Sequence, residues 1–167
     1  LYEVQIFLKT VQVLMSSYNG EKYIREQIES ILRQQGVLVK LLVRDDGSQD
    51  ATISILKEYE KRKQIEVIYG DNIGPYKSFL SLLDACNEAD YYSFSDQDDI
   101  WLDDKLISGI NFLEMENGKI PLLYCSSLRR VNENLELENI QSFPGLKTNI
   151  YSALVRERLA GCTFVIN

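Results

Sequence analysis

Histidine is absent from the 167 residues of this chain. The imidazole group is the usual general base near neutral pH, a common zinc ligand, and the central member of Ser-His-Asp and Cys-His catalytic sites. The sequence therefore excludes these classes of site within the chain. We expect any general base to be a carboxylate.

Cysteines and long apolar runs are also scarce. The three cysteines, Cys86, Cys125 and Cys162, are odd in number and widely spaced. This pattern argues against a disulfide framework and a CxxC metal site, and favours a reducing cytoplasm. No apolar run approaches the ~20 residues that span a bilayer, and residues 1–10 lack the basic start and cleavage site of a signal peptide. We expect a cytoplasmic protein, with attachment to the inner face of the membrane left open.

The charge balance is acidic, with a formal net charge of -7 and 18 basic residues scattered along the chain. Proteins that bind nucleic acid cluster their lysines and arginines to contact the phosphate backbone, so this class of partner is disfavoured. Acidic groups instead favour the binding of a divalent cation.

Length and composition predict one domain over residues 1–167. Leu1 is not a natural initiator, and Asn167 directly follows the apolar stretch Thr163 to Ile166. We therefore expect the chain to be truncated at its C-terminal side.

Strand-like and helix-like segments alternate along the first three quarters of the sequence. Buried-strand patterns and helical spacing of apolar residues alternate in a way that predicts an α/β fold with a mostly parallel sheet flanked by helices. The stretch from Leu128 to Asn149 is polar and predicts a loop or a polar hairpin. The predicted strands cover 11–16, 37–43, 65–69, 91–95, 121–126 and 162–166, and the predicted helices begin near 21, 50, 75 and 101.

Polar clusters follow three of these predicted strands. In doubly wound sheets, ligands bind beyond the carboxyl ends of the strands, so we expect the three clusters to converge in space. The clusters are Ser17, Tyr18 and Asn19 after the first strand, Asp45 and Asp46 after the second, and Asp96, Asp98 and Asp99 after the fourth.

The third cluster is the candidate metal site. Asp96 and Asp98 are one residue apart at a strand end, where a bend can turn both carboxylates toward one cation. Oxygen ligands suit Mg²⁺ or Mn²⁺, which take their remaining ligands from water and substrate phosphates. The alternative is a solvated acidic turn in which Asp99 caps the helix near Trp101. We expect Asp98 to be a metal ligand and Asp99 to be the cap.

Asp45 and Asp46 are candidates for accepting hydrogen bonds from a pyrimidine N–H or a ribose hydroxyl. The alternative is a turn in which Gly47 takes a positive φ and Ser48 or Asp50 caps the next helix. Tyr18 is a candidate for packing on a base, or it belongs to the core. Trp101, Phe79 and Phe94 are expected in the core.

Three segments of the sequence form recognisable motifs: Val13-Leu14-Met15-Ser16-Ser17-Tyr18-Asn19-Gly20, Asp45-Asp46-Gly47-Ser48 and Ser95-Asp96-Gln97-Asp98-Asp99-Ile100-Trp101. Through these motifs the chain resembles family 2 glycosyltransferases of the GT-A fold over nearly its whole length. Two further segments, Asn72-Ile73-Gly74-Pro75 and Gly161-Cys162-Thr163, are similar to the bacterial rhamnosyltransferase-like branch.

The resemblance implies an inverting transfer of a sugar from a nucleoside diphosphate to a saccharide or lipid-linked acceptor in polysaccharide synthesis. By resemblance, the first loop and Asp46 hold the base, Asp96 lies near the ribose, and Asp98 binds Mg²⁺ or Mn²⁺. The donor implied is dTDP-rhamnose or a UDP-sugar. The catalytic base is expected beyond Asn167, since Glu157 precedes the Gly-Cys-Thr segment, and the chain alone is expected to have little transferase activity.

Three other functions fit parts of the pattern. A phosphoacceptor signalling domain places its acid pair after the first strand and needs a lysine at the end of the fifth, but residues 121–127 contain none. A haloacid-dehalogenase-like phosphatase also places its Asp-x-Asp pair after the first strand. A non-catalytic nucleotide-sugar-binding domain has the same sequence features as an enzyme in this region and stays open.

Overall fold

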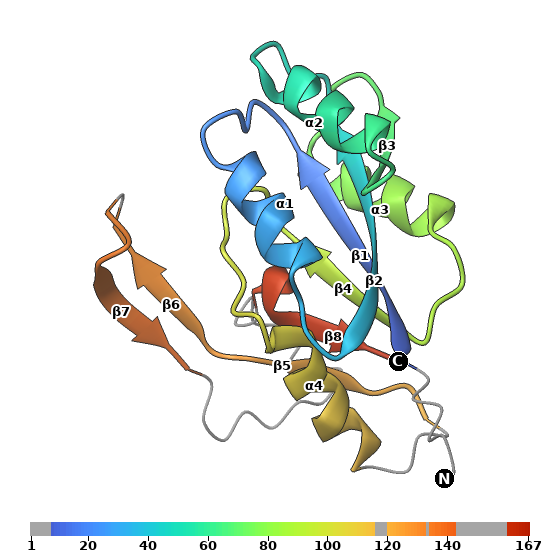
Figure 1. Ribbon diagram of the computed structural model, residues 1–167, viewed down its shortest axis with the longest axis vertical. Helices are drawn as coiled ribbons and strands as arrows, with labels where there is room; N and C mark the ends of the chain where they lie inside the picture. Colours follow the sequence, from blue (N-terminus) through green and yellow to red (C-terminus); the bar gives the residue numbers. More distant parts are fainter. Residues whose placement is uncertain (1–7, 116–119, 133, 143–159) are drawn as a thin grey trace, which may run out of the picture.

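The computed structural model describes residues 8–115, 120–132, 134–142 and 160–167 (Figure 1). Strands and helices alternate up to α4, as the apolar pattern predicts, and short strands follow. The strands are β1 (Lys9–Ser17), β2 (Val37–Asp45), β3 (Glu66–Tyr69), β4 (Tyr91–Ser95), β5 (Leu123–Cys125), β6 (Leu128–Val131), β7 (Leu137–Gln141) and β8 (Phe164–Ile166). The helices are α1 (Ile24–Leu32), α2 (Thr52–Lys61), α3 (Pro75–Ala85), α4 (Lys105–Glu114) and the 3-10 turn η1 (Gly161–Thr163).

Six strands form one sheet in the order β3-β2-β1-β4-β8-β5. Neighbours among β1 to β4 are parallel, whereas β8 runs antiparallel to both β4 and β5. The predicted α/β class with a mostly parallel sheet is confirmed. Because β1, β2 and β4 are parallel neighbours, their carboxyl ends lie at one edge of the sheet.

The two faces of the sheet are covered unequally. Apolar residues of α1, α2 and α4 pack on one face, against alternate residues of the strands such as Val13 and Val43. The opposite face carries a smaller cluster in which Leu82 of α3 packs on Leu14 and Leu42. The helices therefore leave the carboxyl edge of the sheet to the loops that follow β1, β2 and β4.

Helix α3 begins where the sequence predicts. Gly74 takes φ 83°, a left-handed conformation that favours glycine, and Pro75 then occupies the first turn. This change of direction lets the chain turn from the loop after β3 into the helix.

The region from Trp101 onward differs from the prediction. The helix begins at Lys105 rather than near Trp101, and Trp101 lies in the preceding loop with its ring buried. The expected fifth strand is the short β5, and the polar stretch after Leu128 contains the hairpin β6–β7. In Figure 1 this hairpin extends away from the sheet.

No helix in the described ranges is both long and apolar enough to cross a membrane. A cytoplasmic location stays a prediction. Cys86, Cys125 and Cys162 are free thiols.

Candidate functional site

The three polar clusters converge at the carboxyl edge of the sheet. Ser17 and Asp45 are register partners at the ends of β1 and β2, and the Asp46 N–H donates to the Ser17 carbonyl at 2.8 Å. On the other side, the Gln97 side chain contacts the backbone of Tyr18. The expected convergence is therefore confirmed.

The loop after β1 is fixed by the loop after β2. Asn19 takes φ 48°, and its N–H donates to the Ser48 hydroxyl at 2.9 Å while its side-chain oxygen accepts from Gln49 N–H at 2.8 Å. The Gly20 N–H donates to the Thr52 hydroxyl at 2.8 Å. Tyr18 is 44% exposed, so it is available to a ligand and is not a core residue.

Asp45 and Ser17 are both buried at this edge. The Asp45 carboxylate accepts hydrogen bonds from Ser48 N–H at 3.0 Å and from the Ser48 hydroxyl at 2.5 Å. These bonds form the turn that the sequence offered as the alternative for this segment, with Gly47 at φ 82°. The Ser17 hydroxyl is buried and has no hydrogen-bond partner among the described residues.

Asp46 is 2% exposed and lies against the loop that leads into α3. Its carboxylate accepts hydrogen bonds from Ile73 N–H and Gly74 N–H, both at 2.9 Å, and forms an ion pair with Arg44. Burial acts to raise the pKa of Asp46, but the hydrogen bonds from Ile73, Arg44 and Gly74 outweigh it and hold the pKa below its ordinary value. Asp46 is therefore an ionised carboxylate inside the protein.

Asp96, Asp99 and Cys162 form what we call the strand-end cluster. One ligand atom from each lies within 4.8 Å of the other two. Loss of surrounding water raises the pKa of both carboxyl groups, and for Asp96 the charges of Asp99 and Asp98 raise it further. Burial and the charge of Asp99 also raise the pKa of the Cys162 thiol, which is therefore neutral at pH 7.

The strand-end cluster fits a divalent cation. The Asp99 Oδ2 atom is buried without a hydrogen-bond partner among the described residues, and the two crowded carboxylates would be stabilised by a positive ion between them. Carboxylate oxygens suit Mg²⁺ or Mn²⁺, whereas a neutral thiol does not coordinate hard cations. Asp96 and Asp99 are therefore the residues placed to share a cation.

Asp99 does not lie as the sequence predicts, and the metal-ligand role of Asp98 stays a prediction. Asp98 is exposed and is not part of the strand-end cluster. The expectation that Asp99 caps the following helix is wrong, because α4 begins only at Lys105. The first turn of α4 is satisfied from the segment that follows α1, since the Leu106 N–H donates to the Gln34 side-chain oxygen at 3.0 Å.

The loop that carries the cluster rests on Gln27 of α1. This side chain is fully buried. In the amide orientation that satisfies all its neighbours, its oxygen accepts from Ser95 Oγ at 2.6 Å and from Trp101 Nε1 at 3.2 Å, and its nitrogen donates to Ser30 Oγ and the Asp99 carbonyl. Gln27 therefore sets the path of the backbone from the end of β4 to Trp101.

Lys105 lies beside the strand-end cluster at the start of α4. Its ammonium nitrogen lies 3.5 Å from the centre of the Trp101 ring and 3.4 Å from the Ser93 hydroxyl. Burial lowers the pKa of Lys105 to about 7, against the opposing influence of Cys162 and Asp99. The cluster therefore has a cationic neighbour whose charge changes near neutral pH.

Sequence reasoning missed Arg44, Cys162 and Lys105 as parts of this region, and it gave Gln97 no role. Cys162 lies in the Gly-Cys-Thr segment quoted for the resemblance, but nothing in the sequence pairs it with residues after β4. The pairing arises because β8, which follows Cys162, lies next to β4 in the sheet. Glu157 lies outside the described residues.

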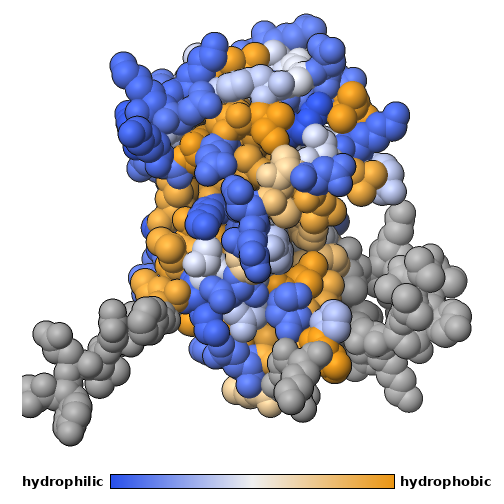
Figure 2. Space-filling view, turned by 90° about the vertical axis from the view of Figure 1, so that its right-hand side faces the viewer, coloured by the Kyte–Doolittle hydropathy of each residue, from blue (hydrophilic) through white to orange (hydrophobic). Residues whose placement is uncertain are grey.

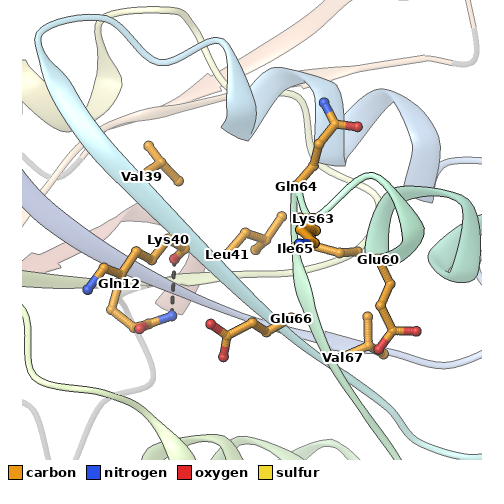
Figure 3. A pocket seen from close by; sticks show the side chains of 10 residues that line it. All are labelled: Gln12, Val39, Lys40, Leu41, Glu60, Lys63, Gln64, Ile65, Glu66 and Val67. Atoms are coloured by element: carbon orange, nitrogen blue, oxygen red, sulfur yellow. Dashed lines mark hydrogen bonds between the residues drawn. The ribbon is translucent and has the colours of Figure 1, made fainter.

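A separate hollow of about 530 Å³ lies away from this edge, where β3 begins beside β2 (Figure 3). Its walls include Gln12, whose amide nitrogen donates to the Lys40 carbonyl at 3.1 Å, and Glu66 at the start of β3. No residue of the three polar clusters lines it. The hollow is therefore distinct from the site.

Comparisons with known proteins agree with this arrangement. Residues 12–145 match the model of glycosyl transferase family 2. The chain is 37% identical over 110 residues to the dTDP-rhamnosyl transferase RfbG of Shigella flexneri, covering 62% of this chain and 38% of the relative. It is 34% identical over 105 residues to the putative teichuronic acid biosynthesis glycosyltransferase TuaG of Bacillus subtilis, covering 62% and 41%. The aligned region spans less than half the length of either relative.

Solved structures show the same architecture. S. aureus TarS 1–349 in complex with UDP superposes with a TM-score of 0.57 at 27% identity, covering 64% of this chain and 32% of that one. The mannosyltransferase PcManGT from Pyrobaculum calidifontis, solved with GDP-Man and Mn²⁺, gives a TM-score of 0.55 at 20% identity, covering 64% and 33%, and shows the likeness of fold alone.

Proposed function

Because the chain belongs to glycosyl transferase family 2, we propose that it binds the nucleoside-diphosphate-sugar donor of a metal-dependent glycosyltransferase. The observation that carries this proposal is the meeting of three polar strand ends at one edge of a parallel sheet, with Asp96 and Asp99 close enough to share a cation. Ligands of such sheets bind at this edge.

The nucleoside is assigned to the ends of β1 and β2. The exposed ring of Tyr18 supports a stacking role, and Asn19 and Ser17 lie beside it. Asp46 accepts three hydrogen bonds from the protein, so one lone pair of Oδ2 is left for a base N–H. Asp45, whose oxygens bind Ser48, acts mainly by shaping the turn that holds Asn19.

The diphosphate is assigned to the end of β4. Asp96 would hold Mg²⁺ or Mn²⁺ together with a second carboxylate. The sequence motif favours Asp98 as the second ligand, and the observed geometry favours Asp99. When bound, such an ion supplies positive charge beside the diphosphate as it leaves. Asp99 has a buried carboxylate oxygen, whereas Asp98 is an exposed residue. Replacing each of them in turn therefore shows which one is the second ligand.

The reaction proposed is an inverting displacement. An acceptor hydroxyl attacks the anomeric carbon, the bond from that carbon to the diphosphate oxygen breaks, and the hydroxyl proton passes to a carboxylate base. That base is expected beyond Asn167. The proposed donor is dTDP-rhamnose or a UDP-sugar, and the proposed acceptor is a saccharide or lipid-linked saccharide of a bacterial polysaccharide. RfbG is named as a dTDP-rhamnosyl transferase, and TarS 1–349 has been solved with UDP-GlcNAc.

Calorimetric titration with UDP, dTDP and GDP, each with and without Mn²⁺, tests the proposal. We expect at least one nucleotide to bind only with Mn²⁺, and its affinity to fall more than tenfold in Asp96→Asn. The matched control is Asp84→Asn, an exposed carboxylate on α3. Asp98→Asn and Asp99→Asn, measured in parallel, identify the second ligand. Absent or metal-independent binding of all three nucleotides would overturn the assignment.

A further inference from the structure

Arg44, at the end of β2, is a buried cation whose contacts all lie beside the proposed nucleoside site. The residue is 5% exposed, and both terminal nitrogens of its side chain are engaged. One nitrogen pairs with Asp46 and lies 3.3 Å from the Ser78 hydroxyl, and the other donates to the Asp71 carbonyl at 3.1 Å. We propose that Arg44 is a positioning residue that fixes Asp46 as a hydrogen-bond acceptor and so selects a uracil- or thymine-type base over cytosine. This inference rests on the proposed function.

The bonding capacity of Asp46 leaves one direction for a ligand. Oδ1 accepts from both Arg44 and Ile73 N–H, so its two lone pairs are used. Oδ2 accepts from Gly74 N–H and has one lone pair left. Because Arg44 holds Oδ1, the carboxylate cannot rotate to exchange its two oxygens without breaking an ion pair.

The charge of Arg44 decides what that free position can bind. Burial of a carboxyl group that is 2% exposed favours its protonated form, which has an O–H donor, and Arg44 opposes that protonation together with the Ile73 and Gly74 N–H groups. With Arg44 beside it, Asp46 remains an acceptor only. Uracil and thymine present a ring N–H at N3, whereas cytosine presents a lone pair there. An ionised Asp46 therefore attracts the first two bases and repels the third.

The fold leaves space for this guanidinium. A Cβ atom at Gly70 would lie 2.7 Å from a terminal nitrogen of Arg44, closer than atoms in contact can approach. Ser78, which contacts Arg44, is fully buried and also accepts a hydrogen bond from the Ser16 hydroxyl at 2.7 Å. Arg44 therefore contacts the loop after β3 and Ser78 of α3, and Ser78 in turn contacts β1. Among the described residues, Arg44 is the one charged side chain that acts on Asp46. The carboxylate of the neighbouring Asp45 accepts a hydrogen bond from Ser48.

The test compares UDP with CDP, which differ only on the edge of the base. Calorimetry with Mn²⁺ gives the ratio of the two affinities for the wild-type chain, Arg44→Met and Arg44→Lys. We expect the wild type to favour UDP at least tenfold, Arg44→Met to lower that ratio at least fivefold, and Arg44→Lys to restore most of it. Arg25→Met, which breaks the exposed ion pair with Glu58, is the matched control and should leave the ratio unchanged.

A purely structural role for Arg44 would weaken UDP and CDP by the same factor, and an unchanged ratio in folded Arg44→Met therefore overturns the inference. If Arg44→Met does not fold, the UDP to CDP ratio of Gly70→Ala replaces it as the test. This variant retains Arg44, but the added Cβ displaces the guanidinium from its position beside Asp46. A UDP to CDP ratio equal to that of the wild type in Gly70→Ala overturns the inference as well. Failure of the wild type to bind any of UDP, dTDP and GDP is a different result, because it rejects the proposed function itself.

Discussion

The side-chain amide of Gln97 pairs with both backbone groups of Tyr18. The Tyr18 N–H donates to Gln97 Oε1 at 2.9 Å, and Gln97 Nε2 donates to the Tyr18 carbonyl at 3.0 Å. This pairing joins the loop after β1, assigned to the nucleoside, to the loop after β4, assigned to the diphosphate. Both halves of the proposed donor site are therefore held in place before a ligand binds, which reduces the entropy lost on binding.

Replacing Gln97 with alanine tests this coupling. Each lost hydrogen bond should cost about 0.5–1.5 kcal/mol of unfolding free energy, and we expect nucleotide affinity to fall because the two loops separate. Gly20→Ala should mimic the change, since a Cβ there would overlap Gln97 Oε1 and displace the amide. Urea denaturation and calorimetry measure both effects.

The double variant Gly20→Ala/Gln97→Ala serves as the control for that experiment. Once Gln97 is truncated, the alanine at position 20 meets no amide, so its extra cost should nearly vanish. Additive losses of affinity in the double variant would mean that the two residues act separately.

Gln27→Leu should destabilise the chain strongly although the volume changes little. The substitution leaves two buried polar groups without their partner, Trp101 Nε1 and the Asp99 carbonyl, while Ser95 Oγ keeps the Asp96 carbonyl. Each such group costs about 1–3 kcal/mol, so we expect a loss of at least about 2 kcal/mol in urea denaturation. Gln64→Leu, on the loop between α2 and β3, is the control and should change stability little. A loss below about 0.5 kcal/mol for Gln27→Leu would contradict the network.

Lys105→Met should stabilise the metal-free chain, and more at pH 6.5 than at pH 10. Burial lowers the pKa of Lys105 from its ordinary 10.5 to about 7. Between these values the unfolded chain binds the proton that the folded chain has lost, so stability rises with pH, and below pH 7 the penalty of burying the charge is fully present. One unit of pKa shift corresponds to about 1.4 kcal/mol, and we expect at least this gain at pH 6.5.

Urea denaturation in EDTA at the two pH values measures the effect, with the exposed Lys61→Met as control. Equal changes for Lys105→Met at pH 6.5 and pH 10 would show that the ammonium group is well solvated in the folded chain.

Asp99→Asn should make the Cys162 thiol more reactive. The charge of Asp99 raises the pKa of this thiol, after the larger influence of burial. Because the thiolate is the form that alkylates, the rate at pH 7 should rise about tenfold for each unit by which the pKa falls. Mass spectrometry after timed iodoacetamide treatment measures this rate, and Cys86 in the same digest is the reference. An unchanged ratio of the two rates would show that Asp99 and Cys162 are not close in solution.

Much of the fold is predictable from local patterns. The apolar residues Ile24, Ile28 and Ile31 recur at helical spacing and are all fully buried in α1. The β-branched run at Val11 and Val13 forms the central strand, and polar residues begin where the strands end. Each of these signals lies within a few residues of the structure it specifies, so it can be recognised in one sequence.

The start of α4 is a counterexample. Its apolar period extends back to Trp101, yet the helix begins at Lys105 because Gln34, just after α1, satisfies the Leu106 N–H and Trp101 is buried in the core. Tertiary packing overrides a local helical pattern in this segment.

The sequence by itself determined the α/β class, the order of strands and helices, and the placement of Asp45, Asp46 and Asp96 at strand ends. Only the tertiary structure decided what these carboxylates contact. Strand order brings Cys162 to Asp96 and Asp99, and the turn into α3 brings Ile73 and Gly74 to Asp46. The physical reason is that a side chain's pKa and bonding depend on atoms within a few ångströms. Those atoms come from segments far away in the chain, whose approach no local pattern encodes.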